Sequence, residues 1–336
     1  MINDKTLPVS PFLSLIVPVF NETPSLEIFF SQLLKVIENY KGKLEIIIVN
    51  DGSTDDTKTT VLSYIEKFPF IKLISFSRNF GKEAAITAGV DHSAGDVVIP
   101  IDVDLQDPPE LILKMIDKWA EGYDIVYARR SRRNSDSFIK RNSAECFYRI
   151  FNWIADIHMP SNVGDFRLMD RKVINALKLL PERNRFNKGL FAWVGFSSAT
   201  ISYERKGRAE GKSRWSLWKL WNFALDGIFS FSMVPLRVWS YLGAFVAVFA
   251  FFYIGFLLIR VVLFGIDVPG YASLMTVVLF FGGIQLLSIG ILGEYIGRIF
   301  IETKSRPIYI IESIFTSPGN TSDLKPSELM LDKYGS

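Results

Sequence analysis

The sequence is poor in the residues that build disulfides and zinc sites. Its 336 residues include one cysteine, Cys146, and two histidines, His92 and His158, which lie far apart in the chain. A single cysteine excludes an internal disulfide, and two isolated histidines give no zinc-ligand spacing. The formal net charge is only +3. Basic character is therefore local, and we expect no nucleic-acid partner.

We also expect no signal peptide, whereas long apolar runs lie nearer the other end of the sequence. The first residues, "MINDKTLPVSP", lack the apolar core of a signal peptide. Apolar runs cover residues 238–264 and 271–296, and mean hydropathy is +0.22, which is unusual for a soluble enzyme. Each run exceeds the ~20 apolar residues that cross a bilayer. Because only "GIDVPG" separates them, we predict a transmembrane helical hairpin with both ends on one side of the membrane.

Basic residues flank this hairpin and are absent from its loop. They are Arg208, Lys212, Arg214, Lys219 and Arg237 before it, and Arg298, Lys304 and Arg306 after it. The positive-inside rule then predicts an integral membrane protein with both termini and the N-terminal domain in the cytoplasm. The predicted parts are a catalytic domain (1–210), juxtamembrane amphipathic helices rich in tryptophan (211–235), the hairpin (236–300) and a tail (301–336). We expect the tail to be mostly disordered after Ile311.

The first 200 residues alternate apolar strands with amphipathic helices. Strands are expected at 13–19, 44–50, 71–77, 96–102 and 123–128, and helices at 25–40, 53–68, 81–93 and 109–122. Residues 198–215 are expected to be a strand entering a basic loop. Ser25 is the expected N-cap of the first helix, and residues 163–177 are expected to be a loop entering a helix. This alternation predicts an α/β fold with a mostly parallel sheet. Such sheets bind ligands at the carboxyl ends of their strands.

Polar clusters follow three of these strands: "NET", "NDGSTDD" and "DVDLQD". Asp102 and Asp104 are two residues apart, so in an extended strand both side chains lie on one face. Two carboxylates are the number that Mg²⁺ uses when substrate phosphates complete its shell, and Gln106 adds a neutral oxygen. Asp107, before Pro108, is expected to cap the next helix. A D-x-D alone is more often a polar turn, so the convergence of the three strand ends carries the prediction.

Several motifs together resemble a known family. They are "LIVPVFNE", "IIIVNDGSTDDT", "NFGKEAAITAG", "DVDLQDPPE" and "VGDFRLMDR". They resemble the inverting glycosyltransferases of family 2 and, with the hairpin, the polyisoprenyl-phosphate glycosyltransferases, over roughly residues 12–310. The resemblance implies a GT-A fold, a nucleotide-sugar donor, Mg²⁺ or Mn²⁺, and a polyprenyl-phosphate acceptor at the lipid bilayer. UDP-glucose is the favoured donor, because the chain resembles the bacterial glucosyltransferase branch.

The same resemblance implies roles for individual residues. The nucleotide pocket would be lined by Pro18, Phe20, Glu22 and Asp51, and the metal and diphosphate would be bound by Asp102, Asp104 and Gln106. Arg130 would contact both the donor and the acceptor phosphate, and Asp165 would lie in the catalytic loop. The acceptor phosphate would also be bound by Arg208, Ser213 and Arg214. Two positions depart from the family pattern. Phe20 stands where tyrosine is frequent, and Arg214 stands where lysine is usual, which keeps the charge but changes the phosphate geometry.

Elementary chemistry supports this assignment but leaves the role of Asp165 open. A nucleoside diphosphate leaving group is stabilised by a dication and nearby basic groups. Basic clusters near 129–141 and 205–214 fit phosphate binding, although cations close to a membrane also attract anionic headgroups. A phosphate acceptor with a second pKa near ~6 is largely deprotonated at neutral pH. Asp165 is therefore either a general base or a group that positions the acceptor.

Other functions stay open at this point. A GDP-mannose donor is the first alternative. A processive polysaccharide synthase is the second, although "GKSRW" has Gly211 where a Gln-x-x-Arg-Trp signature needs glutamine, and two spans are few for a channel. A non-enzymatic membrane scaffold or a translocator is the third. A lone two-helix hairpin buries little surface, so a homo-oligomer is possible.

Overall fold

The computed structural model describes residues 10–131, 149, 151–153, 155, 160, 163–183, 185–204, 231–232, 234–264 and 270–317. In chain order the elements are β1 (Leu13–Val19), α1 (Thr23–Ile37), β2 (Leu44–Asn50), α2 (Thr57–Lys67), β3 (Ile71–Phe76), α3 (Lys82–His92), β4 (Val97–Pro100), α4 (Leu111–Ala120), β5 (Ile125–Arg130), β6 (Val163–Asp170), α6 (Arg171–Lys178), α7 (Asn187–Trp193), β7 (Ser198–Tyr203), α9 (Val234–Phe264), α10 (Tyr271–Thr303) and β8 (Ile311–Phe315). The predicted alternation of strands and helices is confirmed.

The strands form one eight-stranded sheet in the order β7-β5-β6-β4-β1-β2-β3-β8. The centre is parallel, because β1 pairs with both β2 and β4, and β2 pairs with β3. β6 enters antiparallel between β4 and β5, and β8 runs antiparallel along the other edge beside β3. The sheet is thus mostly parallel, as predicted.

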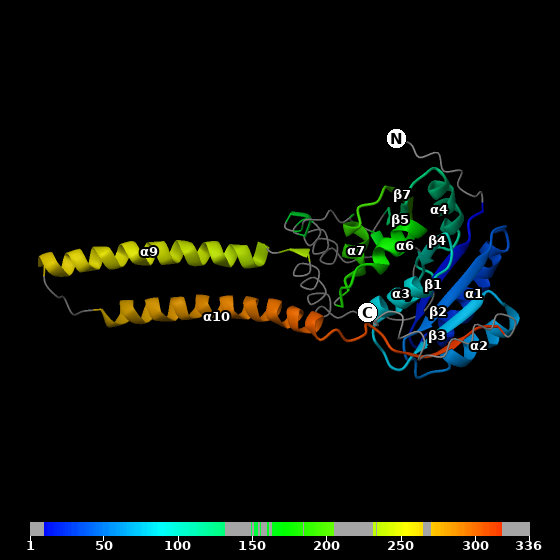
Figure 1. The fold of residues 1–336 in the computed structure, drawn as a ribbon, viewed down its shortest axis with the longest axis horizontal. Helices are drawn as coiled ribbons and strands as arrows, with labels where there is room; N and C mark the ends of the chain where they lie inside the picture. Colours follow the sequence, from blue (N-terminus) through cyan, green and yellow to red (C-terminus); the bar gives the residue numbers. More distant parts are fainter. Residues whose placement is uncertain are drawn as a thin grey trace.

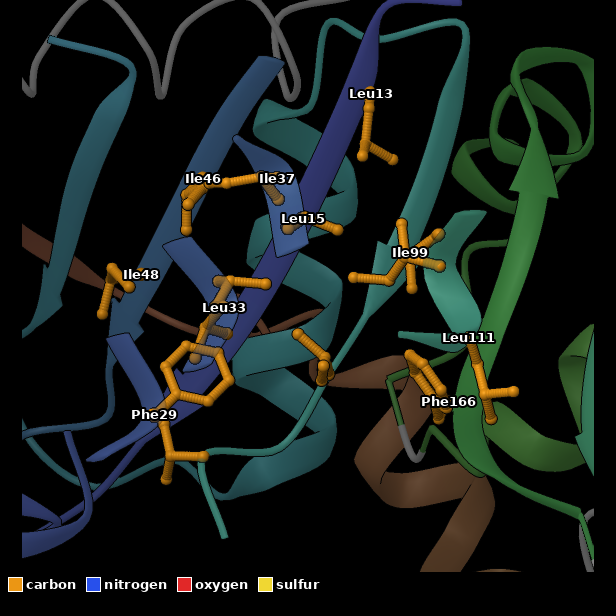
Figure 2. Packing of buried hydrophobic residues seen from close by; sticks show 14 of the residues in the cluster. Leu13, Leu15, Phe29, Leu33, Ile37, Ile46, Ile48, Ile99, Leu111 and Phe166 are labelled. Atoms are coloured by element: carbon orange, nitrogen blue, oxygen red, sulfur yellow. The ribbon is translucent and has the colours of Figure 1, made fainter. Parts of the chain in front are cut away.

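Helices cover both faces of this sheet, which explains why its strands are almost continuously apolar. Alternate side chains of β1 point to opposite faces. Leu13 and Leu15 pack with α1, α2 and α4, whereas Ile16 packs with α3, α6 and α7. Figure 2 shows the first of these clusters, with Phe29 and Leu33 of α1 lying against strand residues.

The two long helices extend away from the sheet domain side by side (Figure 1). α9 and α10 contain windows long and apolar enough to cross a membrane, Leu236–Tyr253 and Phe280–Thr303, and none of either window is buried against the protein. Large apolar side chains such as Phe252 and Phe264 point outward. This surface fits a lipid environment, in agreement with the predicted hairpin.

Two local predictions were wrong. Helix α1 begins at Thr23, with Pro24 in its first turn and Glu22 before it, so Ser25 is not the N-cap; its hydroxyl donates to Glu22 Oε2 at 3.0 Å. The predicted loop at 163–170 is strand β6, and the helix after it starts at Arg171, with Asp170 as N-cap accepting from the Lys172 backbone N–H. Gly164, Asp165 and Arg167 interrupt the apolar pattern and concealed this strand.

The prediction of a mostly disordered tail after Ile311 was wrong for its first residues. After α10 the chain returns to the sheet domain and adds β8 to the free edge of β3 (Figure 1). Tyr309 stacks on Phe76, with ring centroids 5.2 Å apart, and its hydroxyl donates to Asp91 at 2.8 Å. The end of the hairpin is therefore attached to the sheet domain.

Candidate active site

The strand directions bring the predicted site residues to one edge of the sheet. The carboxyl ends of β1, β2 and β4 lie together because these strands are parallel. β6 is antiparallel to β4, with Val97 opposite Asp170 and Val98 opposite Met169. Beyond this pairing, Asp102 and Asp165 both accept a hydrogen bond from the same nitrogen, Lys82 Nζ. These two aspartates, which are 63 positions apart in the sequence, therefore face one site.

Buried apolar and partly exposed acidic side chains alternate in the segment after β4. Ile101, Val103 and Leu105 are each at most 5% exposed and pack into the core, whereas Asp102 and Asp104 between them are partly exposed. The chain then turns at Leu105, which has a φ of +54°. A positive φ is unfavourable for a leucine and marks a backbone that its surroundings hold in place. Asp104 Oδ1 accepts the Gln106 backbone N–H at 3.2 Å and closes the turn.

Lys82 lies at the centre of the site. Its Nζ donates to Asp102 Oδ2 and to Asp165 Oδ2, both at 2.8 Å. Burial opposes the charge on this ammonium, but the two carboxylates outweigh burial and raise the pKa of Lys82. Lys82 therefore carries a full positive charge at neutral pH between the candidate metal ligand and the candidate catalytic aspartate.

Asp165 lies in a strongly positive setting. Burial opposes its charge, yet Lys82, Lys188 and Arg167 hold the pKa of this carboxyl well below its usual range. Arg167 is itself held in place, because it donates to the Gly164 carbonyl at 2.6 Å and lies over the ring of Phe191. Asp165 Oδ1 is buried and has no hydrogen-bond partner within the described part of the chain.

The surroundings of Glu83, next to Lys82, shift its pKa in the opposite direction to that of Asp165. Burial and the nearby Asp165 raise its pKa to about 7, while Lys188 and the Asn187 backbone N–H counteract part of that rise. Glu83 Oε2 accepts this N–H at 3.2 Å, which fixes the start of α7 against α3. The acidic pair Glu83 and Asp165 thus carries less than two full negative charges near neutral pH.

Asp51, the predicted nucleotide-pocket aspartate, holds the loop before α3. It is 3% exposed, and its oxygens accept the backbone N–H groups of Phe80 at 2.6 Å and Gly81 at 2.9 Å. Burial raises its pKa, and the two hydrogen bonds counteract that rise. Gly52 follows with a φ of +67°, and a Cβ there would lie 2.4 Å from the Arg78 carbonyl carbon, so only glycine fits.

The end of β1 provides the other predicted pocket residues. Pro18 and Phe20 are partly exposed and alternate with the buried Val17 and Val19. Glu22 is also partly exposed, and its backbone N–H donates to Thr57 Oγ1 at 3.0 Å. These residues lie beside Asp51 because β1 and β2 are neighbouring parallel strands, with Val19 opposite Asn50.

Asp107 has a different role from the predicted helix cap. The helix that follows has Glu110 before its first residue and no side-chain cap. Asp107 is 4% exposed and accepts a hydrogen bond from the Tyr203 hydroxyl. Arg130 Nε donates to the same hydroxyl at 3.3 Å, and Arg130 Nη2 lies 3.7 Å from Asp107 Oδ1. The buried aspartate thereby fixes the position of Arg130 at the end of β5.

Oxygen atoms at this edge fit a hard dication. The part of the chain that the structure describes contains no group of three or more His, Cys, Asp or Glu side chains that could hold a metal ion. Asp102, Asp104 and Gln106 supply only oxygens, the ligands that Mg²⁺ and Mn²⁺ prefer. Gln106 Oε1 is buried without a hydrogen-bond partner among the described residues. These residues fit a dication that takes further ligands from a substrate.

The structure groups most of the predicted site residues and adds others that sequence reasoning missed. Lys82, Glu83, Lys188 and Tyr203 were not predicted. The motif "NFGKEAAITAG" contained Lys82 and Glu83 but gave no sign that the lysine reaches two aspartates. Arg208, Ser213 and Arg214 lie outside the described residues.

Comparison with known proteins identifies the family. A family model described as glycosyl transferase family 2 matches residues 14–178, and one described as the GtrB C-terminal hairpin matches residues 234–299. An uncharacterized glycosyltransferase from Synechocystis is 51% identical over 90% of this chain and 95% of its own length. A protein named bactoprenol glucosyl transferase from Shigella phage SfX is 50% identical over 90% of this chain and 99% of its own. A prophage bactoprenol glucosyl transferase homolog from Escherichia coli K12 is 48% identical, over the same shares.

The two matches correspond to the two structural parts. The first covers β1 to α6 of the sheet domain and therefore includes Lys82, Asp102, Asp104 and Asp165. The second covers α9 and most of α10. The relatives match both parts in one alignment of nearly their full length. The chain belongs to glycosyltransferase family 2, as an enzyme with a GT-A-like sheet domain and a C-terminal GtrB-type hairpin.

Proposed function

We propose that this glycosyltransferase moves one glucosyl residue from UDP-glucose to a polyprenyl phosphate such as undecaprenyl phosphate, with inversion, at the cytoplasmic face of a membrane. The observation that carries the proposal is the placement of an acidic, oxygen-rich site on a sheet domain whose chain continues into an apolar hairpin. The relatives from Shigella phage SfX and Escherichia coli are named for bactoprenol glucosyl transfer, which supports a glucosyl group and a polyprenyl acceptor.

The donor would lie along the carboxyl edge of the sheet. Pro18, Phe20 and Glu22 would face the nucleotide, and Asp51 shapes that pocket through the loop it holds. Asp102, Asp104 and Gln106 would hold Mg²⁺ or Mn²⁺ with the diphosphate. When bound, a dication supplies positive charge that stabilises the departing nucleoside diphosphate.

The acceptor would approach from the side of Asp165 and Arg130. Tyr203 and Asp107 fix Arg130, so its guanidinium is available for an anionic phosphate without reorganisation. Arg208, Ser213 and Arg214 complete the proposed acceptor site. A phosphate oxygen then attacks the anomeric carbon as the bond to the diphosphate breaks, which inverts that centre.

A positioning role for Asp165 fits its surroundings better than a general base. An efficient general base has a pKa near the working pH, whereas the pKa of Asp165 is held far below it. A phosphate acceptor, with a second pKa near ~6, needs little help in losing a proton. Asp165 would therefore orient the acceptor as a permanent carboxylate.

The hairpin would place this site at the membrane surface. Arg298, Lys304 and Arg306 follow the second apolar span, and the hairpin loop has no lysine or arginine, which supports a cytoplasmic sheet domain and cytoplasmic termini. Small residues within α10, "GGIQLLSIG", offer close helix packing, so a homo-oligomer formed through the hairpin belongs to the same proposal.

A transfer assay with the full chain in detergent or vesicles tests the proposal. Radiolabelled UDP-glucose, Mg²⁺ or Mn²⁺ and undecaprenyl phosphate should give a chloroform-extractable product that carries one sugar. GDP-mannose in a parallel reaction distinguishes the alternative donor, and an insoluble polymer would indicate a processive synthase instead. Asp104→Ala is the matched control, which should lose metal-dependent donor binding. The absence of transfer from every nucleotide sugar tested would refute the proposed glycosyl transfer.

A further inference from the structure

Lys82 connects the two halves of the proposed site and has no role in the function described so far. Its side chain is 40% exposed, whereas those of Asp102 and Asp165 are 36% and 14% exposed. Both carboxylates lie 2.8 Å from the same nitrogen. Their oxygens are therefore no further apart than the sum of these two distances. Without the ammonium, two negative charges would face each other across this gap.

The position of Lys82 at the start of α3 reinforces this arrangement. The N-terminus of a helix carries partial positive charge, which adds to that of the ammonium. Asp51 uses the N–H groups of Phe80 and Gly81 just before α3, so they do not serve Asp102 or Asp165. Within the described residues, Lys82 alone makes an ion pair with either aspartate. Lys188 and Arg167 add positive charge near Asp165, but Lys82 is the side chain that bridges the two aspartates.

A dication at Asp102 would need the same carboxylate that Lys82 now holds. Lys82 occupies Oδ2 of this carboxylate, and a dication on either oxygen would lie close to the ammonium and be repelled by it. Lys82 has a second partner, Asp165, and a flexible stem of four carbons that allows it to move. After release from Asp102, Lys82 therefore still forms its ion pair with Asp165.

We propose that Lys82 is a positioning residue with two states, and that it couples loading of the dication to the orientation of Asp165. In the donor-free enzyme Lys82 forms an ion pair with both aspartates. When a dication and the donor diphosphate occupy Asp102, Lys82 transfers to Asp165 alone and holds that carboxylate in its working orientation. This inference deepens the proposed function and rests on it for the identity of the donor.

The alternative is that Lys82 only stabilises the start of α3. That role predicts a loss of stability on substitution and no change in metal affinity. Competition for Asp102 instead predicts that removing the ammonium increases the affinity for a dication before any substrate is present. The two readings therefore differ in a measurement that requires no catalysis.

The first measurement is Mn²⁺ binding to the full-length protein in detergent without nucleotide, followed by the electron paramagnetic resonance signal of free Mn²⁺. Lys82→Met should bind Mn²⁺ about tenfold more tightly than the unmodified protein, because a competing charge is gone. Lys82→Arg should bind it no more tightly. Lys118→Met is the matched control and should leave Mn²⁺ affinity unchanged, since Lys118 of α4 only forms an exposed ion pair with Glu121, the residue after that helix. Lys82→Gln replaces the methionine variant if that variant does not fold.

The second measurement separates positioning from structure. With saturating Mn²⁺ and UDP-glucose, Lys82→Met should lower kcat about a hundredfold through misplacement of Asp165, with little change in the KM for UDP-glucose. Lys82→Arg should restore part of kcat. A merely structural lysine would lower thermal stability and leave kcat of the folded fraction unchanged.

Each step of the proposal is overturned by a different result. Unchanged Mn²⁺ affinity in both Lys82→Met and Lys82→Gln overturns the competition at Asp102. Increased affinity with undiminished kcat overturns the coupling to Asp165. If the unmodified protein transfers no sugar but Lys82→Met still binds Mn²⁺ more tightly, the proposed function fails while the competition at Asp102 stands.

Discussion

The sheet domain and the hairpin use apolar side chains in opposite ways. Phe29 and Phe30 of the sheet domain are fully buried, whereas Phe245 and Phe252 of α9 are each 70% exposed. The sheet domain removes its apolar surface from water by its own folding. The hairpin has little protein to cover it and fits lipid. The domain is therefore stabilised by internal packing and holds the candidate site, whereas the hairpin has a surface suited to a membrane.

The largest expected effect tests whether the chemistry is confined to the sheet domain. Asp165→Asn removes the negative charge that Lys82 contacts, so kcat should fall about 10²–10³-fold at unchanged donor affinity, the size expected for losing one electrostatic contact in an active site. Glu294→Gln in α10 is the matched change, since Glu294 pairs with Arg298. Transfer assays and donor titrations measure both variants. An equal loss of kcat in the two variants would contradict the assignment of the chemistry to the sheet domain alone.

The next effect concerns packing. Phe29→Ala should lower the free energy of unfolding by about 3–5 kcal/mol, because it opens a cavity in a core that is fully closed. Phe256→Ala removes a side chain of the same size that is 60% exposed on α9, and should change the unfolding of the sheet domain by no more than about 0.5 kcal/mol. Urea unfolding in detergent, followed by tryptophan fluorescence, compares them. A comparable loss from Phe256→Ala would mean that the two regions share one core.

A smaller effect uses the same substitution in both regions. A Cβ at Gly89 of α3 would lie 2.2 Å from Ile16 of β1, so Gly89→Ala should cost about 1–3 kcal/mol through overpacking. A Cβ at Gly255 of α9 would meet nothing within 4 Å. Gly255→Ala should therefore leave the unfolding midpoint of the sheet domain in urea unchanged. A stable Gly89→Ala protein would show that α3 can move away from β1, which would also loosen the position of Lys82.

Sequence patterns predicted much of the fold for a physical reason. β1 and β2 lie at the expected residues because buried parallel strands are continuous apolar runs with clear ends. β6 escaped detection because Gly164, Asp165 and Arg167 interrupt its apolar pattern with residues that serve the site. The ion pairs of Lys82 depend on the antiparallel placement of β6 beside β4, which no local pattern encodes. Residues of one site that come from distant strands cannot be paired from periodicity alone.

β8 was missed for another reason, and it is the place where the two regions meet. Its sequence, "IESIF", is short, and its pairing partner β3 lies more than 200 residues earlier in the chain. An edge strand of this kind is stabilised by backbone pairing and by side chains near it, which composition does not reveal. Ser77 accordingly donates its backbone N–H to the Ile310 carbonyl at 3.1 Å.

The smallest expected effect tests this connection between the regions. Tyr309→Phe removes the hydroxyl that donates to Asp91 and keeps the ring that stacks on Phe76, so stability should fall by only about 1 kcal/mol. Hydrogen exchange should nevertheless quicken in β8, because this edge strand is paired with the sheet on one side only. Tyr253→Phe in α9, where the tyrosine is 52% exposed, should change neither quantity. Unchanged hydrogen exchange in β8 after Tyr309→Phe would mean that backbone pairing alone attaches the hairpin to the sheet domain. The Tyr309 hydroxyl would then not be needed to hold the site in its position relative to the membrane.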